Sequence, residues 1–357
     1  MTAPDRPIPE RPSPAAMPRR TGRCTHGGPQ RRTSNRWVVA ETLDHKSIPS
    51  VILDGRYRRH FANLGRASIA TSAAHARHLT PLVRRCADNR RTEHELLPLP
   101  SGSVLRLTAD PIFGPSQNVF GVNLSAGPPT DTPTPPPTIG AIEWDVLTAR
   151  ATISPDFRTL LDISEAQLDS PTTVPNLISH FDRWDDRTGF LALFDLTNPA
   201  GTWIGTATTQ FTGKQRHNLH IVAKRIHGHR LIRALVCDIS PTDPPPPPDP
   251  IYAALRRAPI TPGHALGIID LHNGLIHEWI ADEPFAHWRN STPQLHPDDI
   301  PVVATARTRL LSKTSTTTIT ARIRFDRASR WILVQAVCTR ITDDDRPQAL
   351  IDVTFSR

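Results

Sequence analysis

A pair of neighbouring β-strands joined by a short turn recurs three times along this chain, at intervals of about 115 residues. Each copy is rich in β-branched and apolar residues, which favour a strand over a helix. The interval matches the size of a small domain, so the sequence predicts three related modules in series. The three strand pairs are 104–112 with 119–125, 219–226 with 231–240, and 331–341 with 349–356.

Proline-rich stretches separate the modules. Residues 127–138 consist mainly of proline and threonine, and residues 241–250 contain five consecutive prolines. Such composition favours extended, semi-rigid spacers. The predicted organisation is a disordered basic tail rich in Pro and Arg (1–34), a first module (35–126), a Pro-rich linker (127–138), a second module (139–240), a polyproline linker (241–250) and a third module (251–357).

Within each module the pattern predicts two strands, a helical region and then three antiparallel strands. In the first module, residues 57–91 are predicted to be helical. In the third module, residues 296–299 (His-Pro-Asp-Asp) predict the start of a helix that runs through Leu311, with the Asp pair capping its free amides. The i, i+3, i+4, i+7 spacing of a buried helix face is carried by Leu79, Leu82, Val83 and Cys86.

The charge of the chain leaves two interpretations open. The formal net charge is +8, and 38 of the 42 basic residues are arginine. This bias reflects either a GC-rich coding sequence or a surface that binds anions. The second interpretation predicts, as the alternative function, a nucleic-acid-associated regulator that uses the basic tail and an Arg-rich helix. The arginines of that helix are Arg84, Arg85, Arg90 and Arg91.

Hydropathy and cysteine usage bear on the location of the protein. The sequence has no window of roughly 18 apolar residues, so no membrane span is expected. The first residues lack the apolar core of a signal peptide. The four cysteines have no metal-binding spacing, and Cys237 and Cys338 fall in predicted core strands as small apolar residues. Reduced, buried cysteines predict a cytoplasmic protein.

The predicted order of elements resembles that of a PAS domain. In the third module, Leu295 to Val303 resembles the His-Pro-Asp-Asp helix start of many PAS domains, and residues 347–354 resemble their last strand. In the second module, residues 139–145 and 235–240 resemble the opening and closing strands. The first module resembles either a PAS or a GAF domain. The whole arrangement resembles uncharacterised tandem-PAS proteins of actinobacteria.

This resemblance implies an α+β fold of three tandem PAS-like modules, each a curved five-stranded antiparallel sheet with short helices on one face. The space between sheet and helices holds either side chains or a ligand, and the opposite face is a frequent dimer surface. Aromatic residues in that space either line a ligand pocket or fill the core themselves. The candidates are Trp144, Phe181, Trp184, Phe190 and Phe194 in the second module, and Trp279, Phe285 and Trp288 in the third.

The sequence offers little chemistry. It has no Gly-rich phosphate loop, no GxSxG and no HExxH motif, so we expect no enzyme, no catalytic residue and no metal site. No cofactor is indicated. The main hypothesis is therefore a non-enzymatic signalling or sensor protein whose modules bind a small ligand or a protein partner. It would transmit by association, either as a homo-oligomer through sheet faces or with a separate effector protein.

Overall fold

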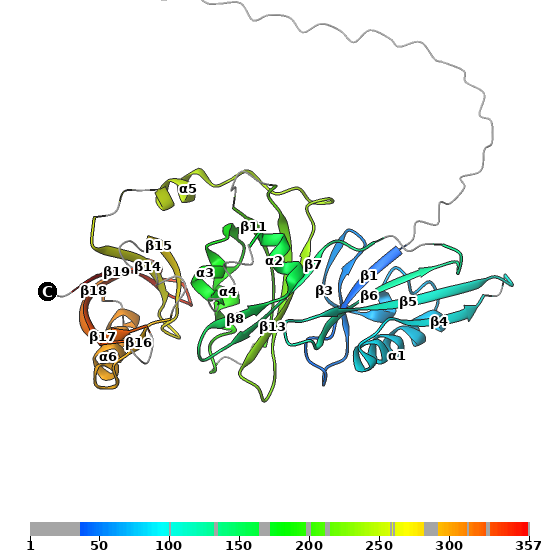
Figure 1. Ribbon diagram of the computed structural model, residues 1–357, viewed down its shortest axis with the longest axis horizontal. Coiled ribbons are helices and arrows are strands. Elements are labelled where there is room, and N and C mark those ends of the chain that lie inside the picture. Colours follow the sequence, from blue (N-terminus) through cyan, green and yellow to red (C-terminus); the bar gives the residue numbers. More distant parts are fainter. Residues whose placement is uncertain are drawn as a thin grey trace, which may run out of the picture. The chain divides into compact units, whose positions relative to one another are not determined.

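Three antiparallel sheets, each accompanied by helices, follow one another along the chain (Figure 1). The predicted α+β class is confirmed. The predicted disordered tail lies outside the described residues. Among the described residues, no helix is both long and apolar enough to cross a membrane. The computed structural model describes residues 36–99, 101–131, 135–163, 172–197, 201–210, 215–257, 259, 261–281, 292–312, 314–325 and 329–355.

The first sheet consists of β1 (Arg36–Glu41), β2 (Ser50–Asp54), β3 (Tyr57–Asn63), β4 (Glu93–Pro98), β5 (Val104–Phe113) and β6 (Val119–Gly127). Its order in space is β3-β2-β1-β6-β5-β4. Helix α1 (Ala73–Asn89) packs along β4, β5 and β6 (Figure 1). The predicted apolar face of α1 is buried there, with Leu79, Leu82 and Cys86 fully covered.

The region 57–91 was predicted to be helical, and its first part is not. Residues Tyr57–Asn63 form the edge strand β3, a 3-10 turn η1 (Leu64–Arg66) follows, and α1 begins only at Ala73. Gly55, with φ of +56°, permits the two-residue hairpin turn that pairs β3 with β2. The side chains of β3 are mostly exposed, so its sequence carries neither a helical nor an alternating pattern.

The second sheet has seven strands in the order β10-β11-β12-β13-β7-β8-β9, and short helices lie on one face. The strands are β7 (Ile139–Asp145), β8 (Arg150–Ile153), β9 (Thr172–Thr173), β10 (Phe181–Trp184), β11 (Thr202–Thr209), β12 (Asn218–Arg225) and β13 (Leu231–Asp238); the helices are α2 (Pro155–Leu161), α3 (Val174–Ile178) and α4 (Arg187–Ala192).

The third sheet has six strands in the order β15-β14-β19-β18-β17-β16. Helix α6 packs against β17. The strands are β14 (His264–Asp270), β15 (Ile276–Ala281), β16 (Gln294–Leu295), β17 (Thr316–Arg324), β18 (Ile332–Arg340) and β19 (Gln348–Phe355); the helical elements are α5 (Pro250–Arg257), the 3-10 turn η3 (Pro297–Asp299) and α6 (Ile300–Leu311).

The three sheets share one core topology. In each, the first strand of the module pairs with the last, as β1 with β6, β7 with β13, and β14 with β19. The three repeated strand pairs of the sequence are the antiparallel pairs β5–β6, β12–β13 and β18–β19. The prediction of five strands per sheet is wrong, because the described residues contain six, seven and six. The additional strands β3, β9, β10 and β16 are edge strands, and all but β3 have four residues or fewer.

The outer faces of the first and second sheets, meaning the faces away from their helices, pack against each other. Strand β13 shows the consequence, because Ile232 and Val236 enter the core of the second module while Leu235 and Cys237 enter the shared cluster. The linker 127–138 therefore does not hold these two modules apart, contrary to its predicted spacer role. The shared cluster comprises Val39, Leu43, Ile52, Leu53, Phe120, Ile139, Ala141, Val222, Leu235, Cys237 and Ile239.

Charged side chains complete this contact between the first two sheets. The Glu41 carboxylate is fully buried and accepts hydrogen bonds from Lys224 Nζ at 2.6 Å and from the Leu43 amide at 3.1 Å. Lys224 Nζ also lies 4.8 Å from the centre of the Phe61 ring. From β13, Arg233 Nη1 donates to the Leu43 carbonyl at 3.2 Å. A buried carboxylate is tolerated only with partners of this kind, so they fix how the two sheets meet.

The third module contacts the helical side of the second. Strand β15 lies against α3, and its Glu278, only 1% exposed, is paired with Arg187 of α4 and with Arg256 Nη2 at 3.0 Å. Arg346 Nη2 reaches the Leu191 carbonyl at 3.2 Å. By contrast, the outer face of the third sheet is open, since Leu333 and Val337 on β18 are 43% and 37% exposed.

Candidate ligand-binding site

A cavity of about 230 Å³ lies between α6 and the inner face of the third sheet. Four strands and one helix form its walls, and the turn before β15 closes one side. Ten of its eleven lining residues are apolar or glycine. They are Ile269, Leu271, Gly274, Leu295, Ile300, Val303, Ala304, Arg307, Leu310, Ile319 and Cys338.

The periodicity of α6 explains the helical wall of this cavity. Residues 300, 303, 304 and 307 follow the i, i+3, i+4, i+7 spacing of one helix face, and Leu310 continues it. Leu310 is 1% exposed and anchors the end of the helix in the core. Ala304 has the smallest side chain on this face and is exposed, so it lines the cavity at its solvent side. The sequence analysis did not identify this helix face as part of a site, although the i, i+3, i+4, i+7 spacing of its residues indicates it.

The start of α6 is held by an ion pair between Asp299 and Arg322, where the sequence predicts an amide cap. The carboxylate of Asp299 accepts from the backbone amide of Arg322 at 2.7 Å and from its Nη2 at 2.8 Å. These bonds lower the pKa of Asp299 to about 2. The expectation that the Asp pair caps free helix amides is wrong for Asp299, whose side chain makes no such bond. The cap at η3 is instead the His296 ring, which accepts from the Asp298 amide at 3.3 Å.

Arg307 is the one charged residue in the lining of the cavity. Its side chain is partly buried, and its Nε is fully buried with no hydrogen-bond partner among the described residues. The turn at Gly274 lies close by, because a Cβ added there would sit 3.5 Å from Arg307 Nη1. A buried guanidinium N–H without a partner is costly, so this atom is a ready donor for an acceptor in the cavity.

On the sheet side, Cys338 contributes a neutral, apolar surface. Its side chain is only 3% exposed, and burial raises the pKa of its thiol to about 11. The thiol therefore stays protonated at neutral pH and behaves as a small hydrophobic group. Ile319 on the neighbouring strand is also buried, at 9% exposure. The lining residues on the inner face of the sheet thus offer the cavity no ionised group.

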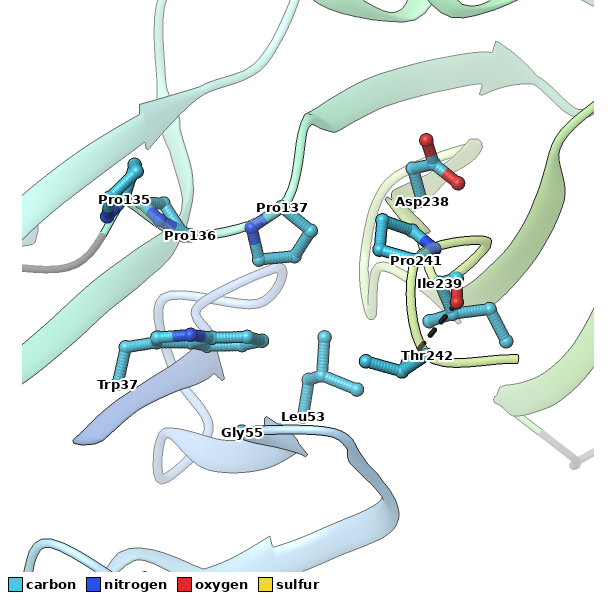
Figure 2. A pocket seen from close by; sticks show the side chains of 10 residues that line it. All are labelled: Trp37, Leu53, Gly55, Pro135, Pro136, Pro137, Asp238, Ile239, Pro241 and Thr242. Atoms are coloured by element: carbon cyan, nitrogen blue, oxygen red, sulfur yellow. Dashed lines mark hydrogen bonds between the residues drawn. The ribbon is translucent and has the colours of Figure 1, made fainter. Parts of the chain in front are cut away.

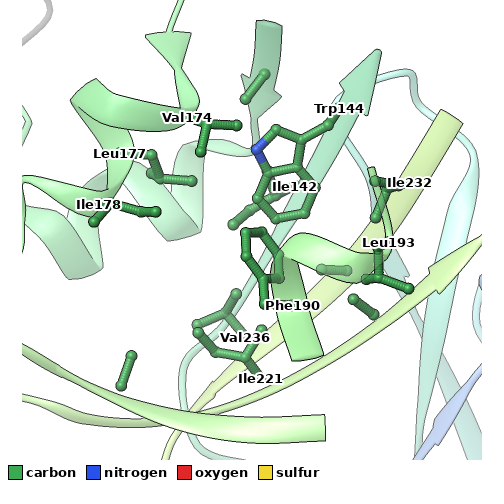
Figure 3. Packing of buried hydrophobic residues seen from close by; sticks show 14 of the residues in the cluster. Ile142, Trp144, Val174, Leu177, Ile178, Phe190, Leu193, Ile221, Ile232 and Val236 are labelled. Atoms are coloured by element: carbon green, nitrogen blue, oxygen red, sulfur yellow. The ribbon is translucent and has the colours of Figure 1, made fainter. Parts of the chain in front are cut away.

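The aromatic candidates of the second module lie together in its core. Trp144 and Phe190 meet edge to face, with ring centroids 5.4 Å apart, beside the residues of α3 (Figure 3). Phe181 and Trp184 meet in the same way at 5.0 Å, and Phe194 closes the group against Phe190. All five are buried. The rings fill the space between sheet and helices, and their role as ligand-pocket residues stays a prediction.

The aromatic candidates of the third module do not line the cavity as far as they are described. Trp279 on β15 is 3% exposed and packs in the core over Gly267, where a Cβ would lie 2.8 Å from its ring. Phe285 and Trp288 fall in the segment 282–291, outside the described residues.

A second cavity, of about 240 Å³, lies where the first two modules meet. Trp37 of β1 forms its floor, and Pro137 and Leu53 lie around the indole ring (Figure 2). The linker prolines thus pack on the first sheet. This cavity is lined by parts of the fixed contact between the two sheets, which makes it a packing feature of that contact.

A third cavity, of about 230 Å³, is more polar and lies beside α2 and β11. His217 and Thr209 in its lining are bonded within the protein. His217 Nδ1 lies 2.9 Å from an Asp238 carboxylate oxygen, and the His217 amide donates to Thr209 Oγ1 at 2.8 Å. These groups have less need of a ligand than the Arg307 guanidinium. No group of three or more His, Cys, Asp or Glu side chains arranged to hold a metal ion occurs within the described part of the chain.

Three of the four arginines on which the nucleic-acid alternative partly rests contact acidic or polar side chains, whereas Arg84 is exposed. Arg85 Nη2 lies 3.0 Å from a Glu95 carboxylate oxygen, and Arg91 Nε lies 3.0 Å from Glu93. Arg90 donates to a side-chain amide oxygen at 3.2 Å. Paired arginines attract phosphate less strongly than free ones, and the basic tail lies outside the described residues. The alternative stays a prediction.

Comparisons with known proteins bear on the fold. Residues 36–137 match the family model described as "Rv3651-like, N-terminal", which covers the first module and the linker after it. A crystal structure of an uncharacterised protein from Mycobacterium tuberculosis is similar over 90% of this chain and 96% of its own, with 16% identity and a TM-score of 0.66. The three-sheet arrangement is therefore also present in that mycobacterial protein. None of the curated proteins matches this chain.

Two further solved structures match with low scores. The structure of an RNA-binding light-oxygen-voltage receptor covers 61% of this chain and 95% of its own, with 9% identity and a TM-score of 0.24. The sensor domain of the histidine kinase DctB from V. cholerae covers 57% of this chain and 72% of its own, with 10% identity and a TM-score of 0.16. These scores are too low to bear on the function.

Proposed function

We propose that this protein is a non-enzymatic sensor of PAS-like modules, in which the third module binds a small molecule between α6 and its sheet. The observation that carries the proposal is the apolar cavity of about 230 Å³ at that place. Concave apolar spaces with a few polar groups are the usual form of a small-molecule site. The shared strand order, with the first strand of each module between the second and the last, supports the PAS-like assignment.

The three modules have different parts in this proposal. The first two bury their outer sheet faces against each other and share one apolar cluster. The third joins the second through β15 and α5, while its cavity and outer face remain open. A ligand that favours one position of α6 would change the surface of the third module and thereby its affinity for a partner. The described lining of the cavity has no pair of acidic and basic groups, so we assign it no catalytic step.

The partner would bind the outer face of the third sheet. The corresponding faces of the first two sheets are already covered within the chain, which confines the expected sheet-face association to this one. Leu333 and Val337 are its exposed apolar residues, and Thr318 and Thr320 make the rest polar. A face of mixed character suits a reversible contact, either with a second copy or with a separate effector protein.

The proposal is tested by ligand-observed NMR with three six-carbon probes: hexan-1-ol, hexanamide and hexanoate. Saturation transfer to at least one of them is expected with the purified protein. The Ala304→Phe variant should lose it, because the new ring occupies the cavity from the helix. Thr305→Phe is the matched control, since residue 305 is exposed on the same helix and does not line the cavity.

The outcomes separate clearly. Binding that is lost in Ala304→Phe and kept in Thr305→Phe supports a ligand site at α6. Absence of transfer for all three probes, or equal binding by both variants, refutes it. Circular dichroism of the two variants checks that each retains its fold, so that loss of binding is not caused by unfolding.

A further inference from the structure

We infer that the ligand of the third module is a small apolar carboxylate, bound through Arg307. This rests on the proposed function, since it names the chemical class that the same cavity takes. The observation behind it is the guanidinium Nε, which is buried and has no hydrogen-bond partner in the described part of the chain, although it borders an otherwise apolar space.

The chemistry of Arg307 selects an anion. A guanidinium presents N–H donors in a planar fork and has no acceptor, and its geometry matches a carboxylate with two parallel hydrogen bonds. A neutral carbonyl satisfies fewer of these donors and leaves the positive charge uncompensated. In a partly desolvated cavity the carboxylate gains more over the neutral carbonyl, both in hydrogen bonding and in charge compensation, because water no longer screens the guanidinium charge.

The rest of the lining restricts the class further. None of the other ten lining residues is charged, so a second anionic group would have no partner, and a cation would face Arg307 without a compensating carboxylate. Val303 and Leu310 on the helix and Ile319 on the sheet form apolar walls, which favour a hydrocarbon body. A molecule with one carboxylate and a hydrocarbon remainder meets both demands.

The volume of the cavity sets the size of the ligand. A group the size of a water molecule occupies roughly 30 Å³ in a liquid, so about 230 Å³ holds roughly eight non-hydrogen atoms. Hexanoate has that number and carries one carboxylate. Hexanamide has the same number and nearly the same shape, but no charge. The two molecules therefore differ in the one property that Arg307 is expected to recognise.

The test compares the affinities of hexanoate and hexanamide for the full chain, measured by NMR titration at constant ionic strength. Hexanoate is expected to bind about tenfold or more tightly than hexanamide. In Arg307→Gln this preference should disappear while hexanamide binds as before. Arg309→Gln is the matched control, because Arg309 is exposed on the same helix and its loss changes the net charge equally.

Each outcome decides one question. Equal affinity for both probes in the unaltered protein, or a preference that survives Arg307→Gln, overturns the inference and leaves a neutral ligand for the same cavity. A preference lost equally in Arg309→Gln also overturns it, since general charge attraction would then be the cause. Absence of binding by every probe refutes the proposed function itself.

Discussion

The packing of the first sheet on the second makes a quantitative prediction for Leu235. This side chain is fully buried on the outer face of β13, within the cluster shared by both sheets. It fills the space in front of Gly121 on β6, where an added Cβ would lie 2.7 Å from Leu235 Cδ1. Truncation to alanine therefore leaves a cavity between two sheets that have little freedom to close it. We expect Leu235→Ala to lower the free energy of unfolding by about 2–5 kcal/mol.

Leu333 supplies the matched control. It is also a leucine on the outer face of a long central strand, but it is 43% exposed. Leu333→Ala should change the free energy of unfolding by no more than about 0.5 kcal/mol. Urea unfolding followed by tryptophan fluorescence measures both variants. Hydrogen exchange then shows whether the loss is confined to β6 and β13, as expected for a local contact.

A compensating substitution sharpens the test. Gly121→Ala alone should cost about 1–3 kcal/mol, because its Cβ has no room beside Leu235. In the double variant Gly121→Ala with Leu235→Ala, the new methyl group enters the space that the leucine vacates. The double variant should then be more stable than the sum of the two losses predicts. Equal, small effects of Leu235→Ala and Leu333→Ala, or strict additivity in the pair, would refute face-to-face packing of the two sheets.

Three other predictions concern buried and paired charges. His220 is 1% exposed, and burial beside Arg58 lowers its pKa to about 4. The free energy of unfolding should therefore fall between pH 6.5 and 4, because the unfolded chain binds a proton there that the folded chain does not. In unfolding measured against pH, His220→Gln should remove on the order of 3 kcal/mol of this fall, and the control His229→Gln should not. The pKa of Asp299 should be about 2 in an NMR titration and return toward 3.8 in Arg322→Gln, whereas an unchanged pKa would exclude the ion pair as its cause. Glu278→Gln should remove the buried carboxylate that pairs with Arg187 and Arg256 and destabilise the contact of β15 with α3 by about 3–5 kcal/mol, seen as faster hydrogen exchange in both elements.

The repeated strand pairs were predictable because each pair is long and contiguous in sequence. The sequence also distinguished covered from open sheet faces, a signal that the prediction did not use. In β13 the run from Ala234 to Cys237 is apolar on both faces, with Leu235 and Cys237 pointing outward, and Arg233 is the charged residue on the same outward face. In β18 the outward positions include Gln335 and Thr339, which alternate with buried residues. A continuous apolar run predicts a strand buried on both faces, and alternation predicts one open face.

Other features depend on contacts that no local pattern records. The edge strand β3 is exposed along most of its length, so only its pairing with β2 determines its conformation. The linker 127–138 has the composition of a spacer, yet composition describes the stiffness of a segment and not the distance between its ends. That distance is set by the apolar outer faces of the two sheets. Arg307 was predictable in principle, as the one charged residue on the apolar face of α6.

The volumes of the core side chains explain why the third module has a cavity beside its helix. In the second module, seven tryptophan and phenylalanine rings belong to the buried core cluster. In the third module the corresponding cluster contains one aromatic residue among its buried, described members, and small residues are frequent. With similar sheets and smaller side chains, the helix and sheet of the third module cannot fill the space between them. Its small core residues are Ala265, Ala306, Ala321, Ala336, Cys338 and Ala349.

This difference in filling gives the modules separate roles. The first two modules cover each other's outer faces, and the second has a core rich in aromatic rings. The third keeps an unfilled cavity at some cost in packing. Unfilled apolar space costs stability in proportion to its volume, so filling the cavity should stabilise the fold even though it removes the ligand site. A variant that fills it, such as Ala304→Phe, should then raise the unfolding midpoint while it abolishes binding. A lower midpoint with unchanged binding would show instead that the helix already packs as closely as it can.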